Sequence, residues 1–136
     1  MIKLALFDID GTLYDEKRKE FTRSAVEALK RLAENGIIVA VATGRTPRNA
    51  LVLKQVGINP EYLICCNGHL VVDDRGDCIV DEVFSAKLVQ DVYDYCKQNR
   101  IGLLWKYPDK AYVYIDNPDF DMLFSKYKNT GKSDFL

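Results

Sequence analysis

The sequence predicts an α/β fold, specifically a doubly wound parallel sheet of the Rossmann-like kind. Three short apolar runs, at residues 2–7, 37–42 and 61–66, predict strands that are buried on both faces. The segments between these runs contain apolar residues at helical spacing, so strands and helices alternate. Such alternation is typical of right-handed β-α-β units, which build a parallel sheet.

The first run, Ile2 to Phe7, ends in two aspartates, Asp8 and Asp10, followed at once by Gly11 and Thr12. Ionised carboxylates belong at the edge of a buried element, where water, a metal ion or hydrogen-bond donors can reach them. The carboxyl end of a parallel strand is where open α/β folds bind their ligands. The first candidate site residues therefore lie here.

A charged loop at residues 14–21 precedes the first predicted helix, which extends from about Thr22 to Asn35. Thr22 is a suitable N-cap, and Gly36 is a suitable C-terminal stop. The strand at residues 37–42 follows directly.

Thr46 and Pro47 predict a cap and a first helical position for a second helix, which ends at Gly57. The third strand then leads into Asn67 and Gly68. These three strand units support the parallel sheet.

The pattern changes in the second half of the chain. The spacing predicts a hairpin at 70–80, a helix at 85–99, strands at 101–107 and 111–116, and a final helix at 118–129. This order is typical of an antiparallel α+β lobe. We place the domain boundary near Glu82, which predicts one domain at 1–82 and another at 83–136.

Asp8 and Asp10 suit phosphoryl chemistry, because their spacing points both side chains the same way. One carboxylate can attack phosphorus, and the other can protonate the leaving oxygen and then activate water. Mg²⁺ fits the same place, since it binds one or two carboxylates together with phosphate oxygens. Gly11 lets backbone amides approach the phosphoryl group. The alternative is an Asp-Gly turn with solvated carboxylates.

The segment after the second strand, Thr43-Gly44-Arg45, offers groups that bind phosphate. The Thr43 hydroxyl and the Gly44 amide can donate hydrogen bonds near the start of a helix. Arg45 can neutralise charge or hold an anionic substrate. Asn67 can extend an amide into the same cleft, although a simple turn explains it equally well.

Composition excludes several classes of protein. The 136 residues carry a net charge of −1, so neither a basic field for nucleic acid nor an acidic tail is present. Nothing approaches 18 consecutive apolar residues, and the start of the chain has no signal-peptide pattern. The four cysteines lack metal-site spacing, and Cys65 and Cys66 are adjacent in an apolar run. Buried free thiols in a cytoplasmic protein are therefore expected.

Taken together, the motifs resemble those of the haloacid dehalogenase (HAD) phosphatase superfamily. The "DIDGTL" sequence at residues 8–13 matches the first motif of that family, and Thr43 matches the second. The "TGR" and "NG" sequences and the α+β segment after Asp81 resemble the Cof-type branch, whose members carry an α/β cap. The resemblance implies a HAD core at 1–82 followed by a partial α+β cap at 83–136.

This resemblance also implies roles for particular residues. Asp8 would be the nucleophile, Asp10 the acid/base, and Mg²⁺ would be held by Asp8 and the Asp10 carbonyl. The implied phosphate- or substrate-binding positions are Gly11, Thr12, Thr43, Gly44, Arg45 and Asn67. The implied substrate is a small phosphorylated metabolite.

The sequence departs from the family where its later motifs belong. A full member continues into a lysine motif and an acidic motif that completes the magnesium site, and neither is present here. The chain therefore resembles the first half of a phosphatase, for which we expect weak magnesium binding and little turnover. A homo-oligomer that covers the exposed sheet edge is a further expectation.

Two other functions remain open at this point. One is a catalytically silent HAD-like binding or scaffold domain, and the other is a phosphomutase or phosphonate-type enzyme using the same aspartates. If residues 83–136 form a lid, Tyr107, Tyr112 and Tyr114 become candidates for substrate contact, although aromatic core packing explains each of them as well.

Overall fold

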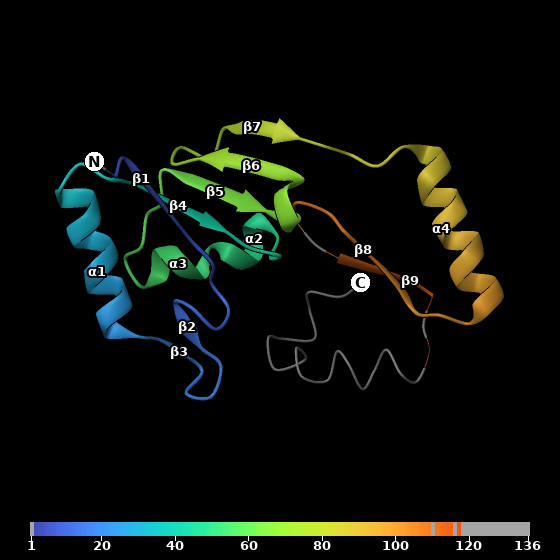
Figure 1. Cartoon of the computed structure of the whole chain (residues 1–136). Helices are drawn as coiled ribbons and strands as arrows, with labels where there is room; N and C mark the ends of the chain where they lie inside the picture. Colours follow the sequence, from blue (N-terminus) through green and yellow to red (C-terminus); the bar gives the residue numbers. More distant parts are fainter. Residues whose placement is uncertain (1, 110, 116, 118–136) are drawn as a thin grey trace. The chain divides into compact units, whose positions relative to one another are not determined.

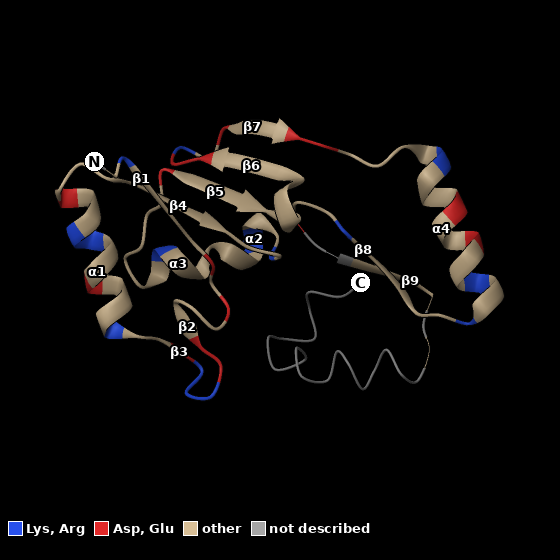
Figure 2. Ribbon diagram, viewed as in Figure 1, with Lys and Arg blue, Asp and Glu red and all other residues tan. Residues whose placement is uncertain are grey.

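The chain forms two compact units, residues 1–82 and 83–136. The computed structural model describes residues 2–109, 111–115 and 117 (Figure 1). In this part of the chain no helix is both long enough and apolar enough to cross a membrane. Basic and acidic residues are interspersed along helices α1 (Arg23–Glu34) and α4 (Ala86–Asn99) (Figure 2).

The first unit is built on a five-stranded sheet with the order β1-β4-β5-β6-β7. Its strands are β1 (Leu4–Phe7), β4 (Ile38–Ala42), β5 (Tyr62–Cys65), β6 (Leu70–Asp73) and β7 (Cys78–Asp81). The β1–β4 and β4–β5 pairs are parallel, which confirms the predicted α/β class.

The β5–β6 and β6–β7 pairs are antiparallel, so the sheet is mixed. The link from β5 to β6 is only the short turn η1 (Cys66–Gly68) and His69, and a parallel crossover needs a dozen or more residues. The predicted hairpin at 70–80 therefore extends the main sheet.

Helices connect the parallel strands. Helix α1 (Arg23–Glu34) links β1 to β4, and it is followed by Gly36, whose φ of 71° suits a glycine after a helix end. The single helix predicted at 46–57 is two short helices, α2 (Pro47–Ala50) and α3 (Val52–Gln55). Thr46 caps α2 as predicted, since its hydroxyl accepts from the Asn49 amide at 3.4 Å.

The segment predicted as a charged loop at 14–21 contains a small hairpin. Its strands are β2 (Tyr14–Asp15) and β3 (Glu20–Phe21). The Asp15 carboxylate closes the turn by accepting from the amides of Lys17 at 2.8 Å and Arg18 at 3.1 Å. The Tyr14 and Phe21 rings meet edge to face, with their centroids 5.2 Å apart.

The buried core of the first unit lies on one side of the sheet. Both crossovers step in the same direction along the sheet, and right-handed crossovers then place both helical segments on the same face. The cluster confirms this placement, because Leu29 of α1 and Leu53 of α3 join Val39 and Val41 of β4. The other core members are Ile9, Leu13, Ala50, Ile58, Cys65 and Leu70.

The second unit contains α4 and an antiparallel pair of strands, β8 (Leu103–Lys106) and β9 (Ala111–Ile115). Ser85 caps α4 by accepting from the Leu88 amide at 3.2 Å. The predicted helix at 118–129 lies outside the described residues. The role of this unit as a cap stays a prediction.

Candidate functional site

The loop after β1 is organised around the carbonyl of Ile9. This oxygen accepts from the amides of Thr12 at 3.2 Å, Leu13 at 3.0 Å and Tyr14 at 2.9 Å. The Ile9 side chain is completely buried, whereas both neighbouring aspartates are exposed. Gly11 turns the chain with a φ of 81°, a value that L side chains rarely adopt. The loop therefore holds Ile9 inside the core and leaves the carboxylates on either side of it outside.

Asp8 and Asp10 differ in their contacts. The Asp8 carboxylate has no hydrogen bond or ion pair with any other described residue. The Asp10 carboxylate forms an ion pair with Arg45, thirty-five positions along the chain. The first carboxylate is thus open to a ligand, and the second is held in place.

Arg45 donates hydrogen bonds to Asp10 from two of its nitrogens. Its Nη2 lies 2.5 Å from Asp10 Oδ1, and its Nε lies 3.0 Å from Oδ2, which makes the pair bidentate. Its Nη1 donates to the Asn49 carbonyl at 3.4 Å. The guanidinium carbon also lies 5.6 Å from the centroid of the Tyr14 ring, within cation–π range. Arg45 therefore joins the ends of β1 and β4 to the β2 strand.

Thr43 lies at the end of β4 and is only 5% exposed. Its amide donates to the Ile64 carbonyl at 2.8 Å, and its hydroxyl oxygen accepts from the Arg45 amide at 3.1 Å. Because the hydroxyl accepts this bond, its own proton remains available to a ligand oxygen.

Gly44 and Asn67 pack against each other. A Cβ on Gly44 would lie 2.9 Å from Asn67 Oδ1, so a larger residue would displace the Asn67 side chain. The Asn67 amide donates to the Thr43 carbonyl at 3.2 Å, and Asn67 itself has a φ of 58°. Asparagine tolerates this left-handed conformation better than most residues. The contact links the end of β5 to the end of β4.

The structure thus connects Asp10 with Thr43 and Arg45, and Thr43 and Gly44 with Asn67. Gly11 and Thr12 lie in the β1 loop, where the Thr12 amide contributes to the turn. Tyr14 and Asn49 were not predicted. Both contact Arg45 in the structure. Nothing in the local sequence around either residue indicates that contact.

The oxygen atoms that suit a magnesium ion are the Asp8 carboxylate and the Asp10 carbonyl, neither of which is hydrogen-bonded to a described residue. Hard oxygen ligands are what Mg²⁺ prefers, so these atoms fit the ion as part of a ligand set. No group of three or more His, Cys, Asp or Glu side chains among the described residues is suited to hold a metal. Protein atoms in this part of the chain would therefore supply only some of the ligands of such an ion.

Cys65 at the end of β5 is not a candidate nucleophile. Its side chain is completely buried. Burial, and to a lesser extent the neighbouring Cys66, raises the pKa of its thiol to about 12. The reactive form of cysteine is the thiolate, so this side chain is inert at neutral pH.

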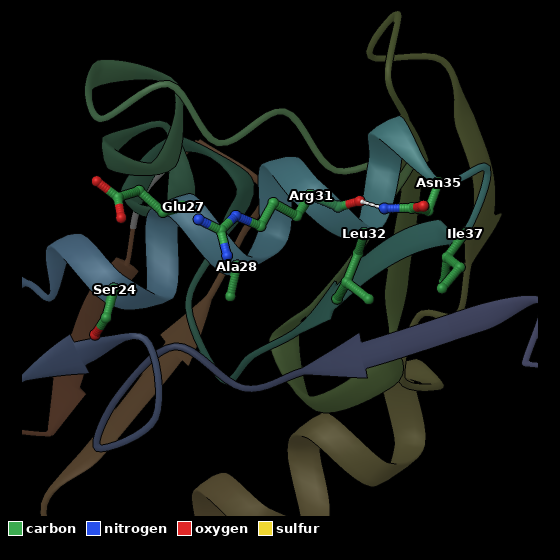
Figure 3. Close-up of a pocket in the computed structure, with 7 residues that line it drawn as sticks. All are labelled: Ser24, Glu27, Ala28, Arg31, Leu32, Asn35 and Ile37. Atoms are coloured by element: carbon green, nitrogen blue, oxygen red, sulfur yellow. Dashed lines mark hydrogen bonds between the residues drawn. The ribbon is translucent and has the colours of Figure 1, made fainter.

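A cavity of about 470 Å³ lies along α1 (Figure 3). Apolar side chains of Ala28, Leu32 and Ile37 line it together with Glu27 and Arg31. None of the candidate site residues contributes to its lining. This hollow and the polar strand ends of the first unit are therefore separate features.

Comparisons with known proteins agree on one family. The profile of the haloacid dehalogenase-like hydrolases matches residues 5–135. An HMP-PP phosphatase of Serratia proteamaculans is 36% identical over 93 residues, which cover 68% of this chain and 33% of that protein.

Solved structures give the same result. A hypothetical protein of Geobacillus kaustophilus is 32% identical with a TM-score of 0.77, and the match covers 94% of this chain and 49% of that one. A HAD/COF-like hydrolase of Plasmodium vivax is 26% identical with a TM-score of 0.75, covering 90% of this chain and 46% of that one. The chain thus spans about a third of the length of the curated relatives and about half that of the solved structures.

Proposed function

This chain belongs to the haloacid dehalogenase-like hydrolase family, Cof-like branch, and on that premise we propose that it carries the phosphoryl-accepting site of a magnesium-dependent phosphatase. The substrate class is a small phosphorylated metabolite, as the name of the Serratia relative suggests. The observation that carries the proposal is the contrast between the two aspartates. Asp8 is exposed and unpartnered among the described residues, while Asp10 is held two positions away.

In this proposal Asp8 and Asp10 divide the reaction. An Asp8 oxygen forms a bond to phosphorus as the bond to the leaving oxygen breaks. Asp10 enters this step carrying the proton that it took from water at the end of the previous turnover, and it gives that proton to the leaving oxygen. Water then attacks the same phosphorus, the bond to Asp8 breaks, and Asp10 takes the proton from water. The Asp8 carboxylate suits the nucleophile, because no described residue has to be displaced from it before the attack.

Thr43 and Gly44 would hold the phosphoryl oxygens. Gly11 would shape the β1 loop, because its amide donates to the Tyr14 carbonyl at 3.0 Å. The Thr43 hydroxyl keeps a proton to donate, and Thr43 is connected to Arg45 by a hydrogen bond. Thr12 would support the β1 loop through its amide. Asn67 would act indirectly, because its side chain packs on Gly44.

Magnesium would be held by the Asp8 carboxylate and the Asp10 carbonyl, with water in the remaining positions. When bound, the ion supplies positive charge beside the phosphoryl oxygens. With only these two ligands from the described residues, we expect a dissociation constant of roughly 1 mM, about 4 kcal/mol. We expect correspondingly slow turnover from the 136-residue chain.

The proposal is tested by hydrolysis of p-nitrophenyl phosphate with and without Mg²⁺, alongside calorimetric titration of the ion. Asp8→Asn keeps the shape of the side chain and removes the nucleophile, so we expect a loss of about 10³-fold or more. Asp10→Asn is expected to slow turnover while a phosphorylated intermediate accumulates. An Asp8→Asn variant that is as fast as the parent would exclude the assignment.

A second function, ligand binding without turnover, is favoured by the small number of metal ligands in the described residues. It predicts that inorganic phosphate binds the parent chain while neither ester hydrolysis nor phosphoenzyme is detected. Turnover that depends on both Mg²⁺ and Asp8 contradicts this alternative.

A further inference from the structure

We infer that Arg45 is a positioning residue for Asp10 and does not bind the substrate itself. This inference rests on the proposed function, because it assigns a role within that reaction. From the sequence alone, Arg45 was expected to contact an anionic substrate. Its contacts in the structure point to a different use of the same charge.

The bidentate pair fixes the plane of the Asp10 carboxylate. Arg45 Nη2 donates to one carboxylate oxygen at 2.5 Å and Nε donates to the other at 3.0 Å. The carboxylate therefore cannot rotate without losing both hydrogen bonds. Each carboxylate oxygen has two lone pairs, and the pair with Arg45 uses one on each. The other position on each oxygen therefore remains to carry or to accept the transferred proton, in a defined direction.

Arg45 is itself restrained at both ends. Its amide donates to the Thr43 hydroxyl at 3.1 Å, and its carbonyl accepts from the Cys66 amide at 2.9 Å. Its guanidinium donates to the Asn49 carbonyl and lies over the Tyr14 ring. The side chain is only 26% exposed. Reaching a phosphate would require it to leave these contacts as well as Asp10.

Asp10 needs such support because its own segment does not provide it. The Asp10 side chain is 42% exposed, and it precedes Gly11, a residue with a φ of 81°. Proton transfer requires hydrogen-bond geometry to the leaving oxygen and then to the attacking water. Without Arg45 the carboxylate samples other rotamers, and both transfers slow.

The test is single-turnover cleavage with protein in excess and Mg²⁺ present, so that slow chemistry is still measured. Two substrates are compared, p-nitrophenyl phosphate and benzyl phosphate, because only the second has a leaving group that requires a proton. For Arg45→Met we expect roughly a 100-fold lower rate with benzyl phosphate and less than about tenfold with p-nitrophenyl phosphate. The ester concentration that gives half the maximal rate should differ little between Arg45→Met and the parent. The inference would be overturned if the rate fell equally with both esters. It would also be overturned if the rate stayed unchanged and only the ester concentration needed for half-saturation rose.

A double-mutant cycle with Asp10→Asn separates the two roles. If Arg45 acts through Asp10, adding Arg45→Met to Asp10→Asn changes the benzyl phosphate rate by less than about twofold. If Arg45 binds the phosphoryl group, its removal weakens binding in either background. An additive loss in the double variant would therefore contradict the positioning role.

Two further variants control for charge and folding. Arg45→Lys keeps the charge but cannot form the bidentate pair, so we expect its benzyl phosphate rate to stay near that of Arg45→Met. Recovery to the parent rate would assign Arg45 to charge alone and overturn the inference. Arg48→Met removes a nearby charge and should match the parent. Thermal melts confirm that each variant folds.

A readout without catalysis separates this inference from the proposed function. The Nε–H resonance of Arg45 should be shifted and slowly exchanging in the parent and should lose both properties in Asp10→Asn. Addition of inorganic phosphate should leave it in place. If phosphate moves this resonance, Arg45 binds the anion and the inference fails. If no variant cleaves either ester, the proposed function fails, and this resonance still decides whether Arg45 serves Asp10 or the anion.

Discussion

The two faces of the five-stranded sheet contain similar residues but have different surroundings. One row of paired residues, Phe7, Val41, Leu63 and Val72, faces the core cluster beneath the helices. We call this side the covered face. The adjacent row is Leu6, Ala40, Tyr62 and Asp73, and we call its side the open face. Val41 is completely buried on the first, whereas Leu6 is 52% exposed on the second.

The difference teaches that apolar composition and burial are separate properties. Leu6 of β1 and Ala40 of β4 are paired in the same row of the open face, yet Leu6 is 52% exposed and Ala40 only 2%. Strand β1 has a neighbour on one side only, while β4 lies between β1 and β5. The burial of a strand residue therefore depends on the neighbouring strands and not on the sequence of its own strand.

The largest expected effect compares Val41→Asp with Leu6→Asp. A carboxylate at Val41 has no partner in an apolar core, so we expect it to destabilise the fold by about 4 kcal/mol or more. The same change at Leu6 meets solvent and should cost about 1 kcal/mol or less. Urea unfolding monitored by circular dichroism measures both. Similar losses in the two variants would show that the open face is covered in solution.

The next effect concerns Thr43, which continues the covered-face alternation of β4 beyond Val41. Thr43→Val removes the oxygen that accepts from the Arg45 amide, so we expect a loss of about 2 kcal/mol in the free energy of unfolding. Thr43→Ser keeps the oxygen and should retain most of that stability. If the valine variant is as stable as the parent, the buried hydrogen bond contributes nothing.

A smaller effect tests the predicted homo-oligomer, in which a second copy covers the exposed edge of the sheet, at β1. If it does, Leu6→Lys should raise the dissociation constant of self-association roughly tenfold, which is about 1.4 kcal/mol. Leu51 is 50% exposed and lies between α2 and α3, so Leu51→Lys is a matched control. Sedimentation velocity over a range of concentrations measures both variants. A monomer at every concentration would refute the prediction.

The smallest effect is the pH dependence due to Cys65, whose side chain shares the covered face with Leu63. Its folded-state pKa of about 12 lies above the unfolded value of 9.0, so the stability contributed by the neutral thiol is complete below pH 9 and is lost as pH rises toward 12. Between pH 8 and pH 10 the parent should lose about 1 kcal/mol more than Cys65→Ala. Urea unfolding at the two pH values measures this difference, and equal losses would contradict the raised pKa.

Much of the fold could be predicted from the sequence, because strong local signals specify it. The apolar runs predicted β1, β4 and β5, and the Thr46-Pro47 pair predicted the start of α2. The hairpin β2–β3 was missed because a side chain, the Asp15 carboxylate, closes its turn within a highly charged segment. The predicted helix at 46–57 divides near Leu51, and no glycine or proline indicates that break.

The candidate site divides in the same way. The order of the motifs was enough to nominate Asp8, Asp10, Thr43 and Arg45, because each follows a buried strand at the edge where parallel strands end together. The pairing of Arg45 with Asp10 could not be predicted, since an arginine can reach many acceptors and only the fold decides which is near. The sequence by itself therefore determined the strands of the main sheet, their polar ends and the family, because alternation and loop chemistry are local. Only the tertiary structure decided which face of β1 stays exposed and which carboxylate is held, because both depend on neighbours that are distant in the chain.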